Sequence, residues 1–235
     1  MGSVFRFKQF EVDQRDCAMK INTDGVLLGA ISIGEQPKYI LDVGTGTGVI
    51  ALMLAQRFEE ACVDAVEIDE AAYLRAKENF GNSKFSVRIH SYYSSFEDLE
   101  PAKLYDLIIS NPPFYTNSLH NPDVKKTLAR HTDHDFFRKL LSFSYDKLSP
   151  IGALQLILPT ELAIEVTEMG TEMGFFLKHK VEVRSFENTE SIRQVINLCK
   201  TKYMDVSSEE LIIYKAKGEY TDHYKKLLSP FFLAY

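Results

Sequence analysis

A glycine-rich turn between an apolar segment and a helical pattern constrains the fold of this chain most. Residues 39–43 are mainly apolar, Gly44, Gly46 and Gly48 follow at alternate positions, and residues 49–55 carry the pattern of an amphipathic helix. This order predicts a strand, a tight turn and a helix whose first backbone N–H groups face the end of the strand. Such a unit is typical of a parallel α/β sheet.

Similar strand-like segments recur along the chain. They cover residues 63–69, 85–89, 105–110 and 153–158, and helical patterns separate them. This alternation predicts a doubly wound sheet whose parallel strands end at one shared edge. Two later segments, 177–186 and 194–200, have no helix between them, so we expect the last strands of a mixed sheet to form an antiparallel hairpin. Residues 211–214 are a further strand-like run.

The two ends of the chain are less regular. Residues 4–12 alternate between apolar and polar side chains, which favours a short strand or hairpin. Thr23 and Asp24 precede a short apolar helix and are candidates for its cap; alternatively, the stretch from Lys20 to Asp24 closes over a ligand at the glycine turn. The apolar tail, residues 220–235, is expected to pack on the body. We expect one domain, with residues 1–35 as an N-terminal extension and 36–235 as the core.

Composition excludes several classes of protein. The 235 residues are 45% hydrophobic, which suits one sizeable core. The sequence has no apolar run of about 18 residues and no signal peptide, so a soluble cytoplasmic protein is expected. Cys17, Cys62 and Cys199 lack the spacing of a disulfide framework or a zinc site. The net charge of −6 opposes non-specific binding of nucleic acid, although local clusters of Lys and Arg leave a basic face open.

The residues around the glycine turn indicate the kind of cofactor. The spacing G-x-G-x-G differs from the G-x-G-x-x-G of dinucleotide-binding turns. Asp42, directly before the turn, repels phosphate and attracts an ammonium or sulfonium group. Glu67, about 20 residues after the turn, is placed to accept both hydroxyls of a ribose, with Asp69 as its neighbour or as a helix cap. The alternative is two solvated acids at the start of a helix.

Asn111-Pro112-Pro113-Phe114 follows the strand predicted at 105–110. The Asn111 amide oxygen and the Pro112 carbonyl are two acceptors for the two hydrogens of an exocyclic amino group, and proline fixes that backbone. Phe114 is expected to stack on a flat base. Holding the amine in this way frees its lone pair for attack on a sulfonium methyl group, largely through positioning. Tyr93, after the third strand, either flanks an adenine ring or belongs to the core.

Residues 116–132 form a long polar stretch beside this motif. Loops of this length in a compact domain are usually functional or disordered. We expect a loop that contacts substrate here, followed by a helix from about residue 135 to 148. The residues in and beside this stretch that are expected to contact the substrate are Tyr115, Lys125, Lys126, Arg130 and His131.

The quoted motifs also resemble a known family. The segment from Asp42 to Gly48, Glu67-Ile68-Asp69 and Asn111-Pro112-Pro113-Phe114 resemble motifs of class I S-adenosylmethionine-dependent methyltransferases that act on amino groups. Residues 7–10, 19–30, 111–115, 129–132 and 220–233 are similar to those of bacterial tRNA1(Val) adenine-37 N6-methyltransferases. Where related enzymes commonly place an acid after the third strand, this chain has Tyr92-Tyr93-Ser94.

The resemblance implies a Rossmann-like, seven-stranded sheet and methyl transfer to N6 of an adenine beside the anticodon, with the base flipped out. It implies S-adenosylmethionine as cofactor, S-adenosylhomocysteine as product, and the anticodon stem-loop of tRNA, an RNA substrate, as partner. From the missing apolar run and the cysteine spacing we expect neither a membrane nor a metal, and no obligate protein partner is evident from the sequence. The implied cofactor residues are Gly44, Gly46, Gly48 and Glu67, closed over by Lys20, Thr23 and Asp24; those holding the amine are Asn111, Pro112 and Phe114. The motif alone leaves open adenine in rRNA or DNA, a protein glutamine, and a nucleotide-binding module without catalysis.

Overall fold

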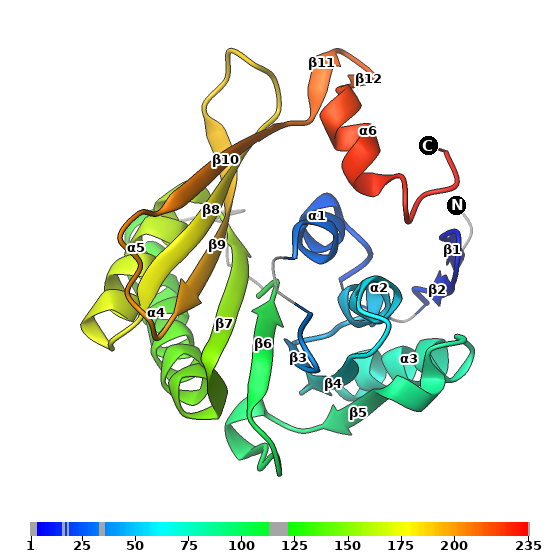
Figure 1. Ribbon diagram of the computed structural model, residues 1–235. Coiled ribbons are helices and arrows are strands. Elements are labelled where there is room, and N and C mark those ends of the chain that lie inside the picture. Colours follow the sequence, from blue (N-terminus) through cyan, green and yellow to red (C-terminus); the bar gives the residue numbers. More distant parts are fainter. Residues whose placement is uncertain (1–3, 16, 18, 33–35, 113–121, 235) are drawn as a thin grey trace.

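A computed structural model describes residues 4–15, 17, 19–32, 36–112 and 122–234, with the backbone alone for 122–133. Its central sheet has eight strands in the order β10-β8-β9-β7-β6-β3-β4-β5 (Figure 1). The strands are β3 (Tyr39–Val43), β4 (Cys62–Glu67), β5 (Ile89–Tyr93), β6 (Tyr105–Ser110), β7 (Leu148–Leu158), β8 (Phe176–Arg184), β9 (Ser191–Cys199) and β10 (Ser207–Ile212). Within this sheet β9 pairs antiparallel with both its neighbours, and every other pairing is parallel.

Helices cover both faces of the sheet (Figure 1). They are α1 (Thr23–Ile31), α2 (Val49–Arg57), α3 (Glu70–Gly81), α4 (Pro122–Lys147), α5 (Thr160–Glu172) and α6 (Asp222–Leu228), with short 3-10 turns at Ser86–Arg88 and Phe96–Asp98. Because successive strand residues point to opposite faces, Ile40 joins the core under α1 and α2, whereas Leu41 joins the core under α4 and α5. The expected α/β sheet, with an antiparallel hairpin formed by β8 and β9, is confirmed.

The two ends of the described chain pack together. Strands β1 (Val4–Arg6) and β2 (Glu11–Asp13) form an antiparallel hairpin, as expected for residues 4–12. After the short strands β11 (Tyr214–Ala216) and β12 (Glu219–Tyr220), helix α6 leads to Phe231, which is buried. Phe7 bridges to Phe232, and the backbone N–H of Lys8 donates to the Phe231 carbonyl at 2.7 Å. The tail therefore packs on the body, as predicted.

Two strands differ from the sequence prediction. The third strand of the sequence prediction, residues 85–89, corresponds to β5, which covers Ile89–Tyr93. It begins later than predicted because residues 86–88 form a 3-10 turn. The Arg88 guanidinium holds this turn by donating to the carbonyls of Ala55, Phe58 and Ala61 at the end of α2. The sheet also has eight strands, not seven, since β10 pairs with β8. Its exposed residues 207–210 lack the alternation by which a strand is predicted.

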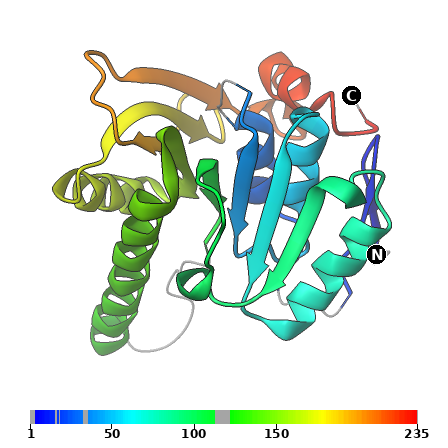
Figure 2. The same cartoon turned by 60° about the horizontal axis from the view of Figure 1, so that its bottom comes forward.

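Helix α4 is the largest correction. Residues 116–132 were expected to form a loop, yet α4 begins at Pro122. Proline at the first helical position and the acidic Asp123 behind it favour a helix start there. The early part of α4 extends past the edge of the sheet at which the parallel strands end (Figure 2). A polar composition suits a helix away from the core, which is why the pattern resembled a loop.

The cap of α1 also differs from the prediction. Asn22 is the N-cap residue, and its side-chain oxygen accepts the Gly25 N–H at 2.8 Å. Thr23 and Asp24 are therefore the first two residues of the helix.

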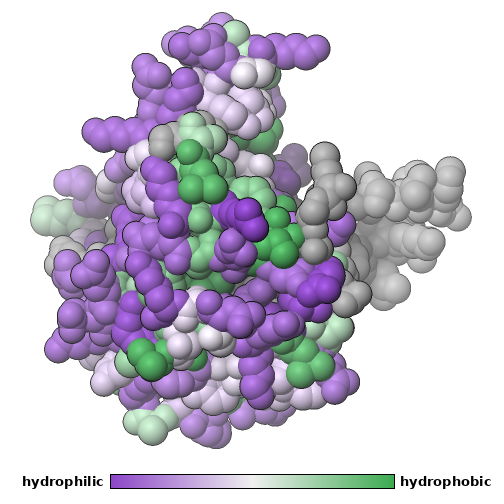
Figure 3. All heavy atoms as spheres, turned by 90° about the vertical axis from the view of Figure 1, so that its right-hand side faces the viewer, coloured by the Kyte–Doolittle hydropathy of each residue, from purple (hydrophilic) through white to green (hydrophobic). Residues whose placement is uncertain are grey.

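One face of the molecule (Figure 3) and the lengths of the described helices bear on the question of a membrane-spanning element. The face that carries β1, β2, α3 and α6 is mostly hydrophilic, with apolar side chains in small separate groups (Figure 3). Within the described ranges, no helix is both long and apolar enough to cross a bilayer.

Candidate functional site

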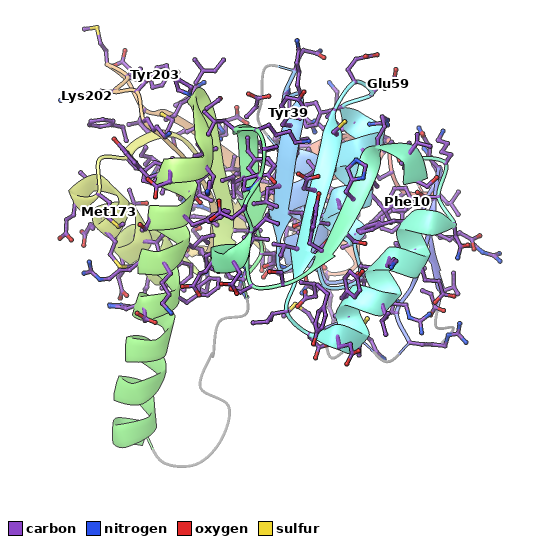
Figure 4. The ribbon with its side chains drawn as sticks, turned by 90° about the horizontal axis from the view of Figure 1, so that it is seen from below. Phe10, Tyr39, Glu59, Met173, Lys202 and Tyr203 are labelled. Atoms are coloured by element: carbon purple, nitrogen blue, oxygen red, sulfur yellow. The ribbon has the colours of Figure 1, made fainter. Side chains whose placement is uncertain are left out.

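A cavity of about 420 Å³ lies where β3, β4 and β6 end. Ligand pockets of roughly 300–1,000 Å³ are typical of small-molecule sites. Tyr39, at the start of β3, marks the opposite edge of the sheet (Figure 4). The cavity is lined by Cys17, Met19, Val43, Gly44, Gly46, Val66, Glu67, Ile68, Asp69, Ala72, Ser94, Ser95, Phe96, Glu97, Ser110, Asn111, Pro112 and Phe136. The glycine turn, the acids and the Asn-Pro pair thus meet at one cavity.

The glycine turn contributes two of its three glycines to this cavity. The N–H groups of Gly44 and Thr45 donate to the Val66 carbonyl at 2.9 and 3.2 Å, which ties the turn to β4. Gly44 and Gly46 line the cavity. Gly48, at the start of α2, does not line it, because this glycine faces the ring of Phe80 on α3. It was expected to line the cofactor site, and the structure gives it a packing role.

Asp42 also lies away from the cavity. Its side chain is fully buried, and one carboxylate oxygen accepts the Thr45 hydroxyl at 2.6 Å and the Ala51 N–H at 3.2 Å. Burial raises the pKa of Asp42 to about 7, against the lowering effect of these two hydrogen bonds. Val43 faces the cavity, so its neighbour Asp42 faces α2. Asp42 therefore holds the glycine turn to α2, and it is not among the residues lining the cavity at which it was expected to attract a cationic cofactor.

Glu67 does face the cavity, at the end of β4. One carboxylate oxygen accepts the Gly46 N–H at 2.9 Å, and the other accepts the N–H groups of Ile68 and Asp69, each at 2.9 Å. A carboxylate has about four acceptor positions. Glu67 is thus fixed in place and keeps one position open for a ligand hydroxyl. Asp69 lines the cavity too and caps α3, accepting the Ala72 N–H at 2.8 Å.

Asn111 and Pro112 also line the cavity, at the end of β6, which β3 separates from β4 and its acids in the sheet. They follow β6, whose last residue, Ser110, donates its hydroxyl to the Val43 carbonyl at 2.8 Å. This bond ties the end of β6 to the strand before the glycine turn. Phe114 and Tyr115 lie outside the described residues. The structure therefore brings together two groups that were predicted to serve one reaction. These are the glycine turn with Glu67, and the Asn111-Pro112 pair.

Comparison with known proteins decides the family. Residues 24–182 match the family described as the methyltransferase small domain. A relative from Pedobacter heparinus, named tRNA1(Val) (adenine(37)-N6)-methyltransferase, is 50% identical over 100% of both chains. The chain belongs to this methyltransferase family. A relative of the same name from Parabacteroides distasonis is 40% identical over 97% of each chain.

Solved structures show the same fold. A predicted O-methyltransferase from Agrobacterium tumefaciens has a TM-score of 0.69 at 17% identity, covering 88% of this chain and 96% of its own. A methyltransferase from Pyrococcus furiosus has a TM-score of 0.60 at 22% identity, covering 81% and 90%. At these identities the likeness is one of fold, and it confirms the expected class I methyltransferase architecture.

One wall of the cavity was not predicted from the sequence of this methyltransferase. Ser94, Ser95, Phe96 and Glu97 form it, after β5 and in the following 3-10 turn. Tyr93 does not line the cavity; it is 55% exposed and stacks on Tyr73 at 5.5 Å between ring centroids. The prediction of Tyr93 assumed a strand ending at residue 89. With β5 four residues later, the positions after the strand are 94–97, and Glu97 is an acid among them.

The N-terminal segment reaches the cavity through Cys17 and Met19. Lys20 and Thr23, which were expected to close over the cofactor, are exposed and do not line the cavity. Asp24 does not line it either; its carboxylate pairs with the Arg193 guanidinium at 2.8 Å. The predicted stretch from Lys20 to Asp24 thus contributes no lining residue to the cavity, whereas Cys17 and Met19, just before it, do.

Four of the five residues expected to contact RNA fall on α4, and the fifth, Tyr115, lies outside the described residues. Lys125, Lys126, Arg130 and His131 lie in the part of α4 whose backbone alone is described, so their side chains fall outside the described structure. Further along the same helix Phe136 lines the cavity. Lys202 and Tyr203, in contrast, lie at the opposite edge of the sheet (Figure 4).

Proposed function

We propose that this chain transfers a methyl group from S-adenosylmethionine to N6 of adenine 37 in tRNA1(Val). The observation that carries the proposal is the shared cavity, which runs from Gly44, Gly46 and Glu67 to Asn111 and Pro112. A cofactor held at one end faces an amine held at the other. The name of the relative that is 50% identical over the full length supplies the tRNA and the position of the base.

The donor set of the cavity fits the adenosine part of this cofactor. Glu67 has an acceptor position open for a ribose hydroxyl, and Asp69 lies beside it. The Ser94–Glu97 wall is where the adenine ring would lie, against Phe96 and within reach of the Glu97 carboxylate. Residues 1–35 close over the bound cofactor in this proposal, supported by Cys17 and Met19 at the cavity. When bound, the cofactor supplies a methyl group on a positively charged sulfur.

Asn111 and Pro112 then hold the acceptor amine. The Asn111 amide oxygen and the Pro112 carbonyl each accept one hydrogen of the N6 amino group, which turns its lone pair towards the methyl carbon. A bound cofactor would supply the methyl group and leave as the neutral thioether, and the methylated nitrogen would release one proton to solvent. Phe114 is proposed to stack on the flipped base.

Helix α4 is the proposed support for the RNA. Its first part extends beyond the edge of the sheet next to the cavity (Figure 2), and Phe136 connects it to the cavity wall. Lys125, Lys126, Arg130 and His131 on this part, with Tyr115 before it, are proposed to contact the anticodon stem-loop. A protein with a net charge of −6 thereby presents positive charge where the phosphates approach.

The proposal is tested by incubating the protein with labelled S-adenosylmethionine and a tRNA1(Val) transcript, followed by digestion and mass spectrometry of the nucleosides. N6-methyladenosine is expected in this transcript and absent from one with guanosine at position 37. Methylation of rRNA, DNA or a protein glutamine, with the tRNA unmodified, would overturn the choice of substrate while leaving the amine chemistry in place.

A further inference from the structure

An ion pair joins two segments near the cavity that are 169 residues apart. The Arg193 Nε atom lies 2.8 Å from the Asp24 carboxylate oxygen. The two side chains are 27% and 20% exposed, so the pair is largely shielded from solvent. Partly buried pairs of this geometry fix the segments they join more firmly than exposed pairs do.

The antiparallel strand explains why Arg193 reaches α1. Gln194 on β9 lies opposite Leu158, the last residue of β7. The first residues of β9 therefore lie at the edge of the sheet where the parallel strands end. Helix α1 packs on the same part of the molecule (Figure 1), and Asp24 lies in its first turn.

The same turn of α1 lies against Asn111. A Cβ atom added to Gly25 would be 3.6 Å from the Asn111 amide nitrogen and 3.5 Å from the Asn22 side-chain oxygen. The amide nitrogen of Asn111 thus faces the turn, which leaves the amide oxygen on the other side for the substrate amine. Two interactions hold this turn: the Gly25 N–H donates to the Asn22 side chain, and Arg193 pairs with the Asp24 carboxylate.

We propose that Arg193 is a positioning residue for methyl transfer. Through Asp24 it fixes the first turn of α1, and that turn fixes the orientation of the Asn111 amide. This inference rests on the proposed function, and it concerns a residue that is not among those lining the cavity. Its expected effect is on the rate of the chemical step, because misplacing a group that holds the reacting atom by about 1 Å costs on the order of 100-fold in rate.

A neighbouring ion pair provides a matched control. Arg184 on β8 pairs with Glu210 on β10 at 2.9 Å, and its side chain is 29% exposed, close to the value for Arg193. It joins two strands and does not reach α1. Arg184→Ala removes an ion pair of the same length class, with a more exposed acid, together with a 3.8 Å contact to Glu182, and it does not release the turn that faces Asn111.

The experiment compares Arg193→Ala, Arg193→Lys, Asp24→Ala and Arg184→Ala under single-turnover conditions with the tRNA1(Val) transcript. We expect Arg193→Ala to lower the rate by roughly 10- to 100-fold, with cofactor affinity by calorimetry and the melting temperature nearly unchanged. Arg193→Lys should recover most of the rate, and Arg184→Ala should match the wild type. The Asp24→Ala/Arg193→Ala double variant should be no slower than Arg193→Ala, since that single variant has already lost the link to Asp24.

Amide hydrogen exchange without RNA separates this inference from the proposed function. The Gly25 and Val26 N–H groups bond to the Asn22 side chain and carbonyl, so Arg193→Ala should speed their exchange and Arg184→Ala should not. Equal exchange in Arg193→Ala and wild type overturns the positioning role, as does an unchanged single-turnover rate. If wild-type protein leaves the tRNA unmethylated, the proposed function fails, and exchange still decides whether Arg193 fixes the turn.

Discussion

Replacing Gly48 with alanine tests the packing of the glycine turn. The backbone of Gly48 has a φ of +84°, and an added Cβ would lie 2.4 Å from Cε1 and 2.8 Å from Cζ of Phe80. A left-handed backbone costs a residue with a Cβ about 1–2 kcal/mol, and forcing an atom into a packed core costs about 1–3 kcal/mol. We expect Gly48→Ala to lower the free energy of unfolding by about 3 kcal/mol, or the melting temperature by about 10 °C.

Gly44→Ala is the matched comparison. Its φ is +70°, but nothing lies within 4 Å of an added Cβ, so only the backbone cost of about 1–2 kcal/mol applies. Its main effect should be weaker cofactor binding, because Gly44 lines the cavity. Thermal unfolding followed by circular dichroism separates the two variants, and adding Phe80→Leu to Gly48→Ala should restore part of the loss. Equal melting temperatures for Gly48→Ala and Gly44→Ala would refute the steric reasoning.

Three further predictions follow from the site. Asn111→Ala should abolish methyl transfer while calorimetry still shows binding of S-adenosylmethionine and none of NAD; retained turnover would remove Asn111 from the mechanism. Burial raises the pKa of Asp42 from 3.8 to about 7. Its contribution to the free energy of unfolding is therefore fully present below pH 3.8, where the carboxyl is protonated in both the folded and the unfolded chain. This contribution is lost as the pH rises to about 7, at a cost of about 4 kcal/mol. Melting temperatures of wild type relative to Asp42→Asn should therefore fall between pH 5 and 7 and level off above; a constant difference would contradict this account. Binding of tRNA should weaken with salt if Lys125, Lys126 and Arg130 contact phosphates, and Lys202→Ala, at the opposite edge of the sheet, should leave the salt dependence unchanged; an affinity independent of salt would count against these contacts.

The sequence allowed the convergence of Gly44, Glu67 and Asn111 to be predicted because parallel strands end at one edge. It misjudged Asp42 because the prediction considered nearness to the turn and not the face of the strand. Tyr93 was assigned to the cavity because the third strand was placed four residues early, and the Arg88 contacts that displace it join segments about 30 residues apart.

Other features had no local signal. Cys17, Met19 and Arg193 reach the site through packing between distant parts of the chain, which no spacing or periodicity encodes. Helix α4 was predicted too short since its first part has no apolar face to mark it. Motifs with fixed spacing were therefore predictable, whereas positions set by long-range packing were not.

The antiparallel placement of β9 has a consequence for biosynthesis. β9 separates β7 from β8 in the sheet, so β8 leaves the ribosome before the strand that joins it to β7 has been made. Until then β7 presents an open edge of unpaired N–H and C=O groups, which is prone to pairing with other chains. A chain that ends before residue 191 would keep Asn111 and Pro112 yet remain an aggregation-prone fragment. Completion of this enzyme therefore depends on its last fifth being synthesised.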